Sequence, residues 1–376
     1  MRIGIVCYPT FGGSGVVATE LGMALAGKGH EVHFVTYNQP VRLDFFSNRL
    51  HFHEVVLEEY PLFQYQPYEL ALSSKMVEVV EKHQLEILHV HYAIPHAYAA
   101  YMAKKMLEDK GINIKVVTTL HGTDITLVGS HPTYKTAVEF SINKSDEVTT
   151  VSNSLKEDTL RLFNIEKDIK VVYNFIDGAK YDKAHQTECK RIALAKPEER
   201  ILTHVSNFRP VKRTDDVIRI FNKVQKEIPS KLLMVGDGPE RLKAENLAKE
   251  LGVDDRVLFL GNSNEVEKIL CYSDVFLLPS ETESFGLAAL EAMAASTAVI
   301  SSNRGGLPEV NIHGKTGYLS EFGDVDDMAK NTIAILKQDA VLEKFKKNAK
   351  EHIKLFSLEN ILPVYEDIYK SCSVTV

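Results

Sequence analysis

Short apolar runs alternate with helical patterns along the whole chain, and this alternation limits the choice of fold more than any other feature. Residues 2–8 form a continuous apolar run rich in β-branched side chains, which is typical of a buried parallel strand. Alternating strands and helices form parallel, doubly wound sheets, so the sequence predicts an α/β fold. After residues 2–8, strands are predicted at 31–37, 85–92, 114–120 and 147–152, and helices at 16–27, 70–83, 96–110 and 153–163.

The same alternation begins again in the second half of the chain. Predicted strands lie at residues 201–205, 231–235, 257–260, 275–278 and 298–302. A length of 376 residues suits two domains, each with its own core. We therefore expect one doubly wound domain over residues 1–170 and a second over 171–357. A C-terminal helix within 358–376 is expected to pack back onto the first domain.

Composition argues against several classes of function. A formal charge of −7 and a pI near 6.1 argue against a nucleic-acid-binding surface. The N-terminal apolar run is too short for a signal peptide, and no run reaches the length of a membrane span. We therefore expect a cytoplasmic protein without stable membrane insertion. The cysteines are scattered without a CxxC pair, which indicates reduced thiols. They are Cys7, Cys189, Cys271 and Cys372.

The segment 279–294 combines a strand end, a polar loop and the start of a helix. The loop carries Glu283, the helix begins near Gly286, and Glu291 lies roughly 7.5 Å further along the helix axis. Free N–H groups and the positive dipole end of a helix suit a phosphate, and carboxylates suit hydroxyl groups. An anion with hydroxyl groups on both sides describes a nucleotide sugar. A capped helix with solvated glutamates is the alternative.

Two further loops are placed to approach a bound phosphate. Arg209 and Lys212 come just past the strand at 201–205, where their cations would meet a diphosphate. An ordinary surface charge run is the alternative. The glycine-rich loop 12–15 follows the first strand, an arrangement that brings backbone close to a phosphate. Its spacing matches neither GxGxxG nor a Walker A loop, so a plain tight turn is an equal alternative.

Histidines stand at the ends of two predicted strands. A histidine at such a place is more often a hydrogen-bonded structural residue than a catalyst. His121 is the best candidate because Gly122 allows a close backbone approach and Asp124 could orient the ring or balance its charge. His89 and His91 share one face of a strand, but no third ligand lies at a recognisable spacing for a metal.

The ordered set of motifs resembles the retaining glycosyltransferases of family four, which use nucleotide-sugar donors and have the GT-B fold. The resemblance covers most of the chain. It implies a hexosyltransferase built from two Rossmann-like domains that face each other across a cleft. The matching segments are residues 12–15, 121–124, 174–177, 209 with 212, 283–291 and 305–309.

The resemblance implies a division of roles at the donor. Arg209 and Lys212 would bind the diphosphate and stabilise the charge that builds on it as the glycosidic bond breaks. Glu283 would hold hydroxyls of the transferred sugar, Glu291 would hold the ribose, and His121 would lie beside sugar and acceptor. The other implied donor contacts are Gly13, Ser14 and Gly15 near phosphate or acceptor, Gly261 and Asn262 near the uracil, and Ser284, Phe285, Gly286 and Leu287 near sugar and phosphate.

The resemblance also implies a reaction without a metal ion or another cofactor. Cationic side chains and a helix dipole would do the work of a metal, and a phosphate oxygen of the donor would take the acceptor proton on the front face. A double displacement on Glu283 is the alternative. Asp324 and Asp326 have the DxD spacing of some metal-dependent transferases, but their place at a predicted helix start indicates a cap.

Within the family, the overall match, including the opening residues 1–15, resembles members that transfer N-acetylglucosamine from UDP-GlcNAc to L-malate, the first step of bacillithiol formation. UDP-GlcNAc and L-malate are therefore the implied substrates. A small dicarboxylate needs cations and hydroxyls, and we expect Tyr92, Thr123 and Lys135 to supply them. For Lys135, an ordinary solvated position on a helix is the alternative.

The sequence leaves two other functions open. It also does not decide whether the protein forms a homo-oligomer. A transferase of the same fold could use another nucleotide sugar and a glycan or lipid acceptor, which would require an exposed basic and aromatic surface. Aromatic residues do gather between 45 and 68, but Glu58, Glu59 and Glu69 dilute positive charge there. A non-catalytic nucleotide-binding protein is the more distant alternative. The missing GxGxxG argues against an oxidoreductase.

Overall fold

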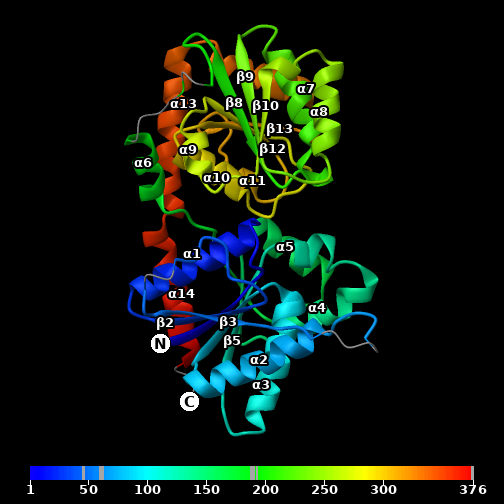
Figure 1. Cartoon of the computed structure of the whole chain (residues 1–376), viewed down its shortest axis with the longest axis vertical. Helices are drawn as coiled ribbons and strands as arrows, with labels where there is room; N and C mark the ends of the chain where they lie inside the picture. Colours follow the sequence, from blue (N-terminus) through cyan, green and yellow to red (C-terminus); the bar gives the residue numbers. More distant parts are fainter. Residues whose placement is uncertain (45–46, 59–62, 187–190, 192–193, 374–376) are drawn as a thin grey trace. The chain divides into compact units, whose positions relative to one another are not determined.

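The chain forms two compact units in a computed structural model that describes residues 1–44, 47–58, 63–186, 191 and 194–373. Unit 1 comprises Met1–Asn174 with Glu359–Val376, and unit 2 comprises Phe175–Leu358. Each is a β-sheet covered by helices (Figure 1). The units divide after Asn174, whereas the sequence pattern placed a boundary at residue 170. Cys189 and the aromatic residues Phe45, Phe46 and Tyr60 lie outside the described residues.

Unit 1 contains a seven-stranded parallel sheet in the order β3-β2-β1-β4-β5-β6-β7. Its strands are β1 (Arg2–Val6), β2 (Glu31–Thr36), β3 (Leu50–Glu54), β4 (Ile87–His91), β5 (Lys115–Leu120), β6 (Glu147–Thr150) and β7 (Ile169–Val171). Its helices are α1 (Gly13–Gly27), α2 (Tyr68–His83), α3 (Tyr98–Glu108), α4 (Pro132–Lys144), α5 (Asn153–Leu162) and α14 (Leu358–Ser373).

Helices cover both faces of the unit 1 sheet. On one face, α2 and α3 share a buried core with Val35, Val90 and Val116. Successive strand residues point to opposite faces, so His89 lies on the other face, where its Nδ1 is 2.7 Å from the Tyr369 hydroxyl of α14. Burial on both faces explains why these strands read as continuous apolar runs.

Unit 2 repeats the architecture with a six-stranded parallel sheet in the order β10-β9-β8-β11-β12-β13. Its strands are β8 (Arg200–Val205), β9 (Ser230–Val235), β10 (Val257–Gly261), β11 (Val275–Leu278), β12 (Ala298–Ser302) and β13 (Gly317–Ser320). Its helices are α6 (Gly178–Gln186), α7 (Thr214–Val224), α8 (Arg241–Glu250), α9 (Val266–Leu270), α10 (Leu287–Ala294), α11 (Leu307–Val310), α12 (Val325–Leu336) and α13 (Asp339–His352).

These two parallel sheets confirm the predicted α/β class. Strands β3, β7 and β13 were not predicted. β3 lies at the edge of its sheet and carries two histidines among its five residues. β7 lies at the other edge and has only three residues, and β13 has only four residues and begins with a glycine. None of these segments gives the long continuous apolar run that marks the inner strands.

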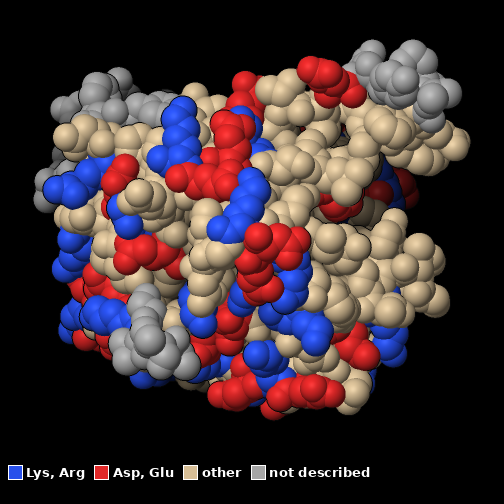
Figure 2. Space-filling model, turned by 90° about the horizontal axis from the view of Figure 1, so that it is seen from below, with Lys and Arg blue, Asp and Glu red and all other residues tan. Residues whose placement is uncertain are grey.

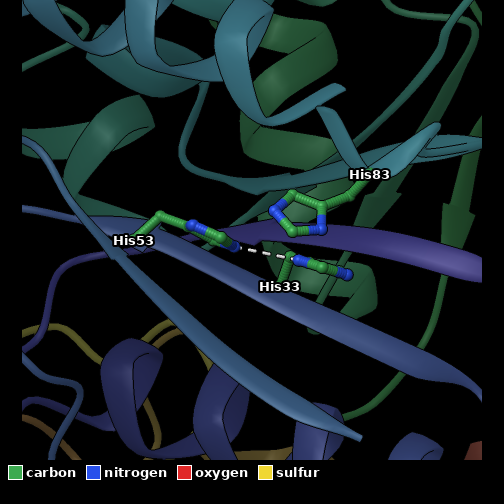
Figure 3. Close-up of side chains that lie close together, drawn as sticks. All are labelled: His33, His53 and His83. Carbon is green, nitrogen blue, oxygen red and sulfur yellow. Dashed lines mark hydrogen bonds between the residues drawn. The ribbon is translucent and has the colours of Figure 1, made fainter. Parts of the chain in front are cut away.

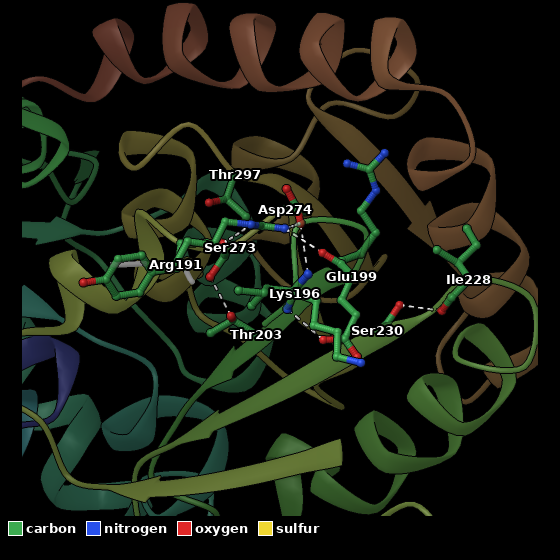
Figure 4. Close-up of polar contacts among 12 residues, drawn as sticks. Arg191, Lys196, Glu199, Thr203, Ile228, Ser230, Ser273, Asp274 and Thr297 are labelled. Atoms are coloured by element: carbon green, nitrogen blue, oxygen red, sulfur yellow. Dashed lines mark hydrogen bonds and ion pairs between the residues drawn. The ribbon is translucent and has the colours of Figure 1, made fainter. Parts of the chain in front are cut away.

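A buried aspartate at the start of β11 ties several parts of unit 2 together (Figure 4). Asp274 accepts hydrogen bonds from Arg191 at 2.7 Å, from Lys346 at 3.1 Å and from the backbone N–H of Ile201 at 2.9 Å. Burial alone would raise the pKa of Asp274, but the cations of Lys346 and Arg191 outweigh it and hold the pKa below its usual value. The carboxylate therefore stays charged and links β8, β11 and α13.

The strand order places a switch point in each sheet. In unit 1, β1 lies between β2 and β4, and in unit 2, β8 lies between β9 and β11. Chain connections run to opposite sides from these central strands, so the loops after the strands on either side of a switch point diverge and leave room for a ligand. The loops after β1 and β4 in unit 1, and after β8 and β11 in unit 2, are therefore where a site is expected.

On the face drawn in Figure 2, acidic and basic side chains are interspersed and form no extended basic area of the kind that binds nucleic acid. Within the described residues, no helix combines the length and the apolar character needed to cross a bilayer.

Candidate active site

A salt bridge joins the two switch-point loops of unit 2. Lys212 ends a short 3₁₀ turn after β8, and its Nζ donates to Oε1 of Glu283 at 2.5 Å. The backbone N–H of Glu281 donates to the carbonyl of Val211 at 2.8 Å, which fixes the same two loops to each other. Ser280 donates to the same oxygen of Glu283 at 3.0 Å. The structure thus brings together two predicted site residues that are far apart in sequence.

Arg209 lies in the same turn as Lys212 but has a different environment. It precedes Pro210 and is exposed. Within the described parts of the chain it forms no salt bridge, so its guanidinium is available to a ligand. A guanidinium and an ammonium at one strand end suit a diphosphate.

Gly305 and Gly306 support the loop that carries Glu283. Gly306 donates its N–H to the carbonyl of Glu283 at 2.8 Å. A Cβ on Gly305 would lie 1.9 Å from that carbonyl oxygen, and one on Gly306 would lie 2.5 Å from the carbonyl oxygen of Ser284. Two backbone segments therefore pack directly against each other, which is why the motif 305–309 needs glycine at its first two positions.

His204 also holds the loops after β8 and β11, and it was not predicted as a site residue. It lies inside β8, where its Nδ1 is 2.8 Å from the carbonyl of Leu277 and its Nε2 is 2.8 Å from the hydroxyl of Ser206. Burial lowers its pKa to about 4, so the ring is neutral near pH 7. A histidine inside the predicted strand 201–205 is the sequence signal that could have identified it.

Helix α10 begins as the sequence predicted, at Leu287 after an N-cap glycine. Gly286 has φ 99°, and no side chain caps the first turn, so backbone N–H groups there can bind an anion. Glu291 lies one turn further on and is 9% exposed. The Phe285 ring is buried edge-on against Phe356, with 5.6 Å between centroids, so Phe285 can contact a donor only through its backbone.

The remaining predicted donor contacts of unit 2 lie at the end of β10. Gly261 is the last residue of this strand, and its carbonyl accepts the N–H of Gly236 at 2.7 Å. Asn262 follows and is exposed. Because parallel strands end at the same edge of a sheet, these residues lie at the edge that also carries the Lys212–Glu283 pair.

In unit 1, the predicted glycine-rich loop is the first turn of a helix. Helix α1 starts at Gly13 rather than at residue 16, after an N-cap glycine, and no side chain caps it. The low helix propensity of glycine explains the error, since packing overrides it here. The Ser14 hydroxyl lies 2.7 Å from the hydroxyl of Tyr92, which follows β4 and has φ 84°. This contact joins the two loops at the switch point of unit 1.

His121 lies at the end of β5 in a row of buried imidazoles. Its Nε2 is 2.8 Å from Nδ1 of His91, and its ring centroid is 5.3 Å from that of Tyr92. Burial lowers the pKa of His121 to about 3, helped by the neighbouring His96. A ring with this pKa is neutral at physiological pH, so His121 can orient or hydrogen bond a substrate but cannot supply a positive charge.

Asp124 does not hydrogen bond to the ring of His121 but fixes the backbone around it. Its carboxylate accepts the N–H groups of Ala93 at 2.8 Å, Gly122 at 2.9 Å and His121 at 3.2 Å. Burial raises the pKa of Asp124 to about 6, and these backbone hydrogen bonds oppose that rise. The residue predicted to orient the His121 ring instead ties the loop after β5 to the loop after β4.

The other predicted contacts in unit 1 differ in their surroundings. Thr123 opens a short π-helical turn and is half-buried. Lys135 is exposed on α4, and within the described residues its side chain forms no hydrogen bond or salt bridge. His89 is hydrogen bonded through both nitrogens, to Tyr369 and to Thr119, in agreement with a structural role.

The DxD segment is a helix cap, as its position in the sequence indicated. The side chain of Asp324 accepts the N–H of Asp327 at 2.9 Å at the start of α12, and Asp326 pairs with Lys223 at 2.6 Å. Cys7, Cys271 and Cys372 form no disulfide within the described residues.

Comparison with known proteins identifies the family. The family described as Glycosyltransferase Family 4 matches residues 11–180, and the family described as Glycosyl transferases group 1 matches residues 186–352. An N-acetyl-alpha-D-glucosaminyl L-malate synthase of Bacillus anthracis is 50% identical over 98% of this chain and 96% of its own length.

Solved structures agree on the fold. A glycosyltransferase from Rickettsia africae ESF-5 superposes with a TM-score of 0.80 at 21% identity, covering 100% of this chain and 99% of its own. HepE from Anabaena, in complex with UDP-glucose, superposes with a TM-score of 0.79 at 18% identity, covering 99% of this chain and 100% of its own. A relative with 50% sequence identity aligns with 98% of the chain, so the protein belongs to glycosyltransferase family 4 and is a hexosyltransferase of the GT-B fold.

Proposed function

We propose that this enzyme transfers N-acetylglucosamine from UDP-GlcNAc to the hydroxyl group of L-malate with retention of the anomeric configuration. GlcNAc-malate made in this way would be the first intermediate of bacillithiol formation. The observation that carries the proposal is the 50% identity, over 98% of the chain, to a relative named for this synthesis. The arrangement of charges in unit 2 supports it independently, because it suits a nucleotide sugar.

In this proposal the donor lies along the carboxyl edge of the unit 2 sheet. Arg209, Lys212 and the N–H groups at the start of α10 bind the diphosphate, and the buried carboxylate of Glu291 accepts the ribose hydroxyls. Asn262 at the end of β10 faces the uracil. As the bond between the anomeric carbon and the phosphate oxygen breaks, Arg209 and Lys212 stabilise the negative charge on the leaving UDP.

The Lys212–Glu283 contact favours a front-face reaction over a double displacement. Oε1 of Glu283 already accepts hydrogen bonds from Lys212 and Ser280, which lowers its nucleophilicity. Among the described residues none hydrogen bonds to Oε2, which can therefore accept hydroxyls of the transferred sugar. The acceptor oxygen bonds to the anomeric carbon on the face that UDP leaves, and its proton passes to a phosphate oxygen of UDP. Cationic side chains and the α10 dipole make a metal ion unnecessary for this step.

Unit 1 offers groups that suit a small dicarboxylate with a hydroxyl. The uncapped start of α1 presents backbone N–H groups to a carboxylate, and the hydroxyls of Ser14, Tyr92 and Thr123 can accept or donate hydrogen bonds. The neutral ring of His121 can hold the malate hydroxyl or the donor sugar. Lys135 is the candidate for a cationic contact.

An acceptor panel tests the proposal. The purified enzyme is incubated with UDP-GlcNAc and one acceptor at a time. The acceptors are L-malate, D-malate, L-lactate and a diacylglycerol dispersion, and the masses of the products are measured by mass spectrometry. We expect GlcNAc-malate from L-malate alone or far ahead of the others. Transfer to the lipid in preference to L-malate would favour the alternative acceptor class, and UDP binding without transfer to any acceptor would favour a non-catalytic role.

A further inference from the structure

A cluster of histidines and one glutamate lies on the unit 1 sheet, apart from the residues discussed so far. Glu31 and His33 are alternate residues of β2, and His51 and His53 are alternate residues of β3. Alternate residues of a strand point to one face, and His33 pairs in register with His51. This face is the one covered by α2, because His33 shares it with Val35 of the α2–α3 core. His83, the last residue of α2, closes the group from above (Figure 3).

We propose that His33, His53 and His83 form a binding site for a transition-metal ion with the preferences of Zn²⁺. One nitrogen from each of the three side chains lies within 4.8 Å of the others. Three nitrogens around a tetrahedral zinc ion lie roughly 3.4 Å apart, as follows from zinc–nitrogen bonds of about 2.05 Å. Nδ1 of His33 and Nε2 of His53 are already 2.9 Å apart, so small side-chain rotations would complete the triangle.

The carboxylate of Glu31 fixes the tautomer of His33 that can bind a metal ion through Nδ1. Nε2 of His33 lies 3.3 Å from Oε1 of Glu31, and the carboxylate can only accept, so Nε2 carries the proton. The lone pair of Nδ1 is then directed towards His53. Histidine ligands of metals commonly donate their second N–H to a carboxylate in this way. Nε2 of His51 lies 3.4 Å from the same oxygen, so Glu31 holds two rings of the cluster.

His83 supplies the second observation that points to a ligand. Its Nε2 is buried and has no hydrogen-bond partner among the described residues. A buried polar atom without a partner costs free energy, and a metal ion would satisfy it. Nε2 of His53 donates to Nδ1 of His33 in the metal-free protein, so metal binding would move the proton of His53 to its Nδ1 and free Nε2 for the ion.

This site is separate from the proposed transfer reaction. β2 and β3 are the two outermost strands at one side of the sheet, and β2 continues for three residues after His33. The bound ion would cross-link β2, β3 and the end of α2, and would therefore stabilise unit 1 rather than take part in catalysis. Three protein nitrogens leave a fourth position for water or for a carboxylate.

Calorimetric titration with Zn²⁺ tests the site. The full chain is prepared without a polyhistidine tag, freed of metal with a chelator and titrated beside His53→Gln, His83→Gln and Glu31→Gln. His131→Asn is the matched control, because His131 is an exposed histidine of the same unit and asparagine can keep its role as N-cap of α4. We expect about one Zn²⁺ per chain, an affinity at least about tenfold weaker in each cluster variant, and no change in the control.

Two further measurements separate binding from misfolding. Co²⁺ in place of Zn²⁺ should give intense visible d–d bands of a tetrahedral site in the wild type but not in His53→Gln. Zn²⁺ should raise the Tm of the wild type more than that of His83→Gln, when each protein is compared with its own Tm in chelator. Wild-type protein that binds no Zn²⁺, or cluster variants that bind it as tightly as the wild type, would overturn the proposal. Transferase activity plays no part in these readouts.

Discussion

Nζ of Lys212 lies 2.5 Å from Oε1 of Glu283, and this salt bridge joins the loops after β8 and β11 at the switch point of unit 2. The two side chains are 21% and 12% exposed, so water screens the pair only in part. Each partner holds the other in place before a donor arrives. In the proposed reaction, the pair would therefore preorganise a cation for the diphosphate and a carboxylate for the sugar, which would reduce the reorganisation needed during the reaction.

Removing either cation of the turn after β8 should slow the reaction. We expect Arg209→Ala and Lys212→Ala each to lower turnover at saturating donor by at least tenfold, or about 1.4 kcal/mol of transition-state stabilisation. Lys223→Ala, which removes a cation from the surface of α7, is the control and should keep full turnover. Steady-state kinetics with UDP-GlcNAc and L-malate provide the measurement. Near-normal turnover of both variants would remove these residues from the mechanism.

The carboxylate on α10 should control affinity for the nucleotide rather than the chemical step. Glu291→Ala is expected to weaken the binding of UDP by about tenfold, because two hydroxyl hydrogen bonds to a charged acceptor are lost. Calorimetry with UDP measures this directly, and Glu343→Ala on α13 serves as the control. Unchanged affinity in Glu291→Ala would contradict the assignment of the ribose.

Two glycines with a positive φ differ in what surrounds them and allow a matched comparison. A Cβ on Gly305, φ 57°, would lie 1.9 Å from the carbonyl oxygen of Glu283, whereas one on Gly314, φ 74°, would meet nothing within 4 Å. Alanine at either position carries backbone strain of about 1 kcal/mol. We expect Gly305→Ala to lose more stability in urea unfolding and to bind UDP-GlcNAc more weakly. Equal behaviour of the two variants would mean that the 305–306 turn does not position Glu283.

Asp274 should make the stability of unit 2 depend on pH. Its folded pKa is held below the usual value, so the stabilisation is present above the unfolded pKa of about 3.9 and is lost as the pH falls through the folded value. Asp274→Asn leaves Arg191 and Lys346 without their shared carboxylate, and we expect it to cost about 3 kcal/mol at pH 7.

Urea unfolding at several pH values measures both effects. The difference between Asp274→Asn and the wild type should shrink as the pH falls below the unfolded pKa of about 3.9 and towards the lower folded pKa, because only the wild type loses this interaction there. A difference that stays constant until the protein is acid-unfolded would show that the charge of Asp274 does not stabilise the fold.

The sequence predicted features that depend on neighbours along the chain. Gly286 as the start of α10 and Asp324 as a cap follow from local rules for helix ends, and the structure has both. The inner strands were found because burial on both faces makes them continuous apolar runs. The start of α1 was missed because glycines at positions 13 and 15 disfavour a helix locally.

Features that depend on contacts distant in sequence could not be predicted in this way. The Lys212–Glu283 pair spans 71 positions, and nothing in the sequence shows that the turn after β8 meets the loop after β11. His204 and the contact between Ser14 and Tyr92 are of the same kind. The histidine cluster did have a local signal, since Glu31 alternates with His33 and His51 with His53, but the register that pairs β2 with β3 was needed to read it.

The measurement that tests the central claim most directly is the mass and the anomeric configuration of the product formed from UDP-GlcNAc and L-malate. Mass spectrometry identifies the acceptor, and the proton coupling of the anomeric hydrogen in NMR distinguishes α from β. The donor is α-linked, and the proposed front-face reaction predicts GlcNAc joined in α-linkage to the malate hydroxyl. Failure to form GlcNAc-malate, or its formation with a β-linkage, would contradict the account.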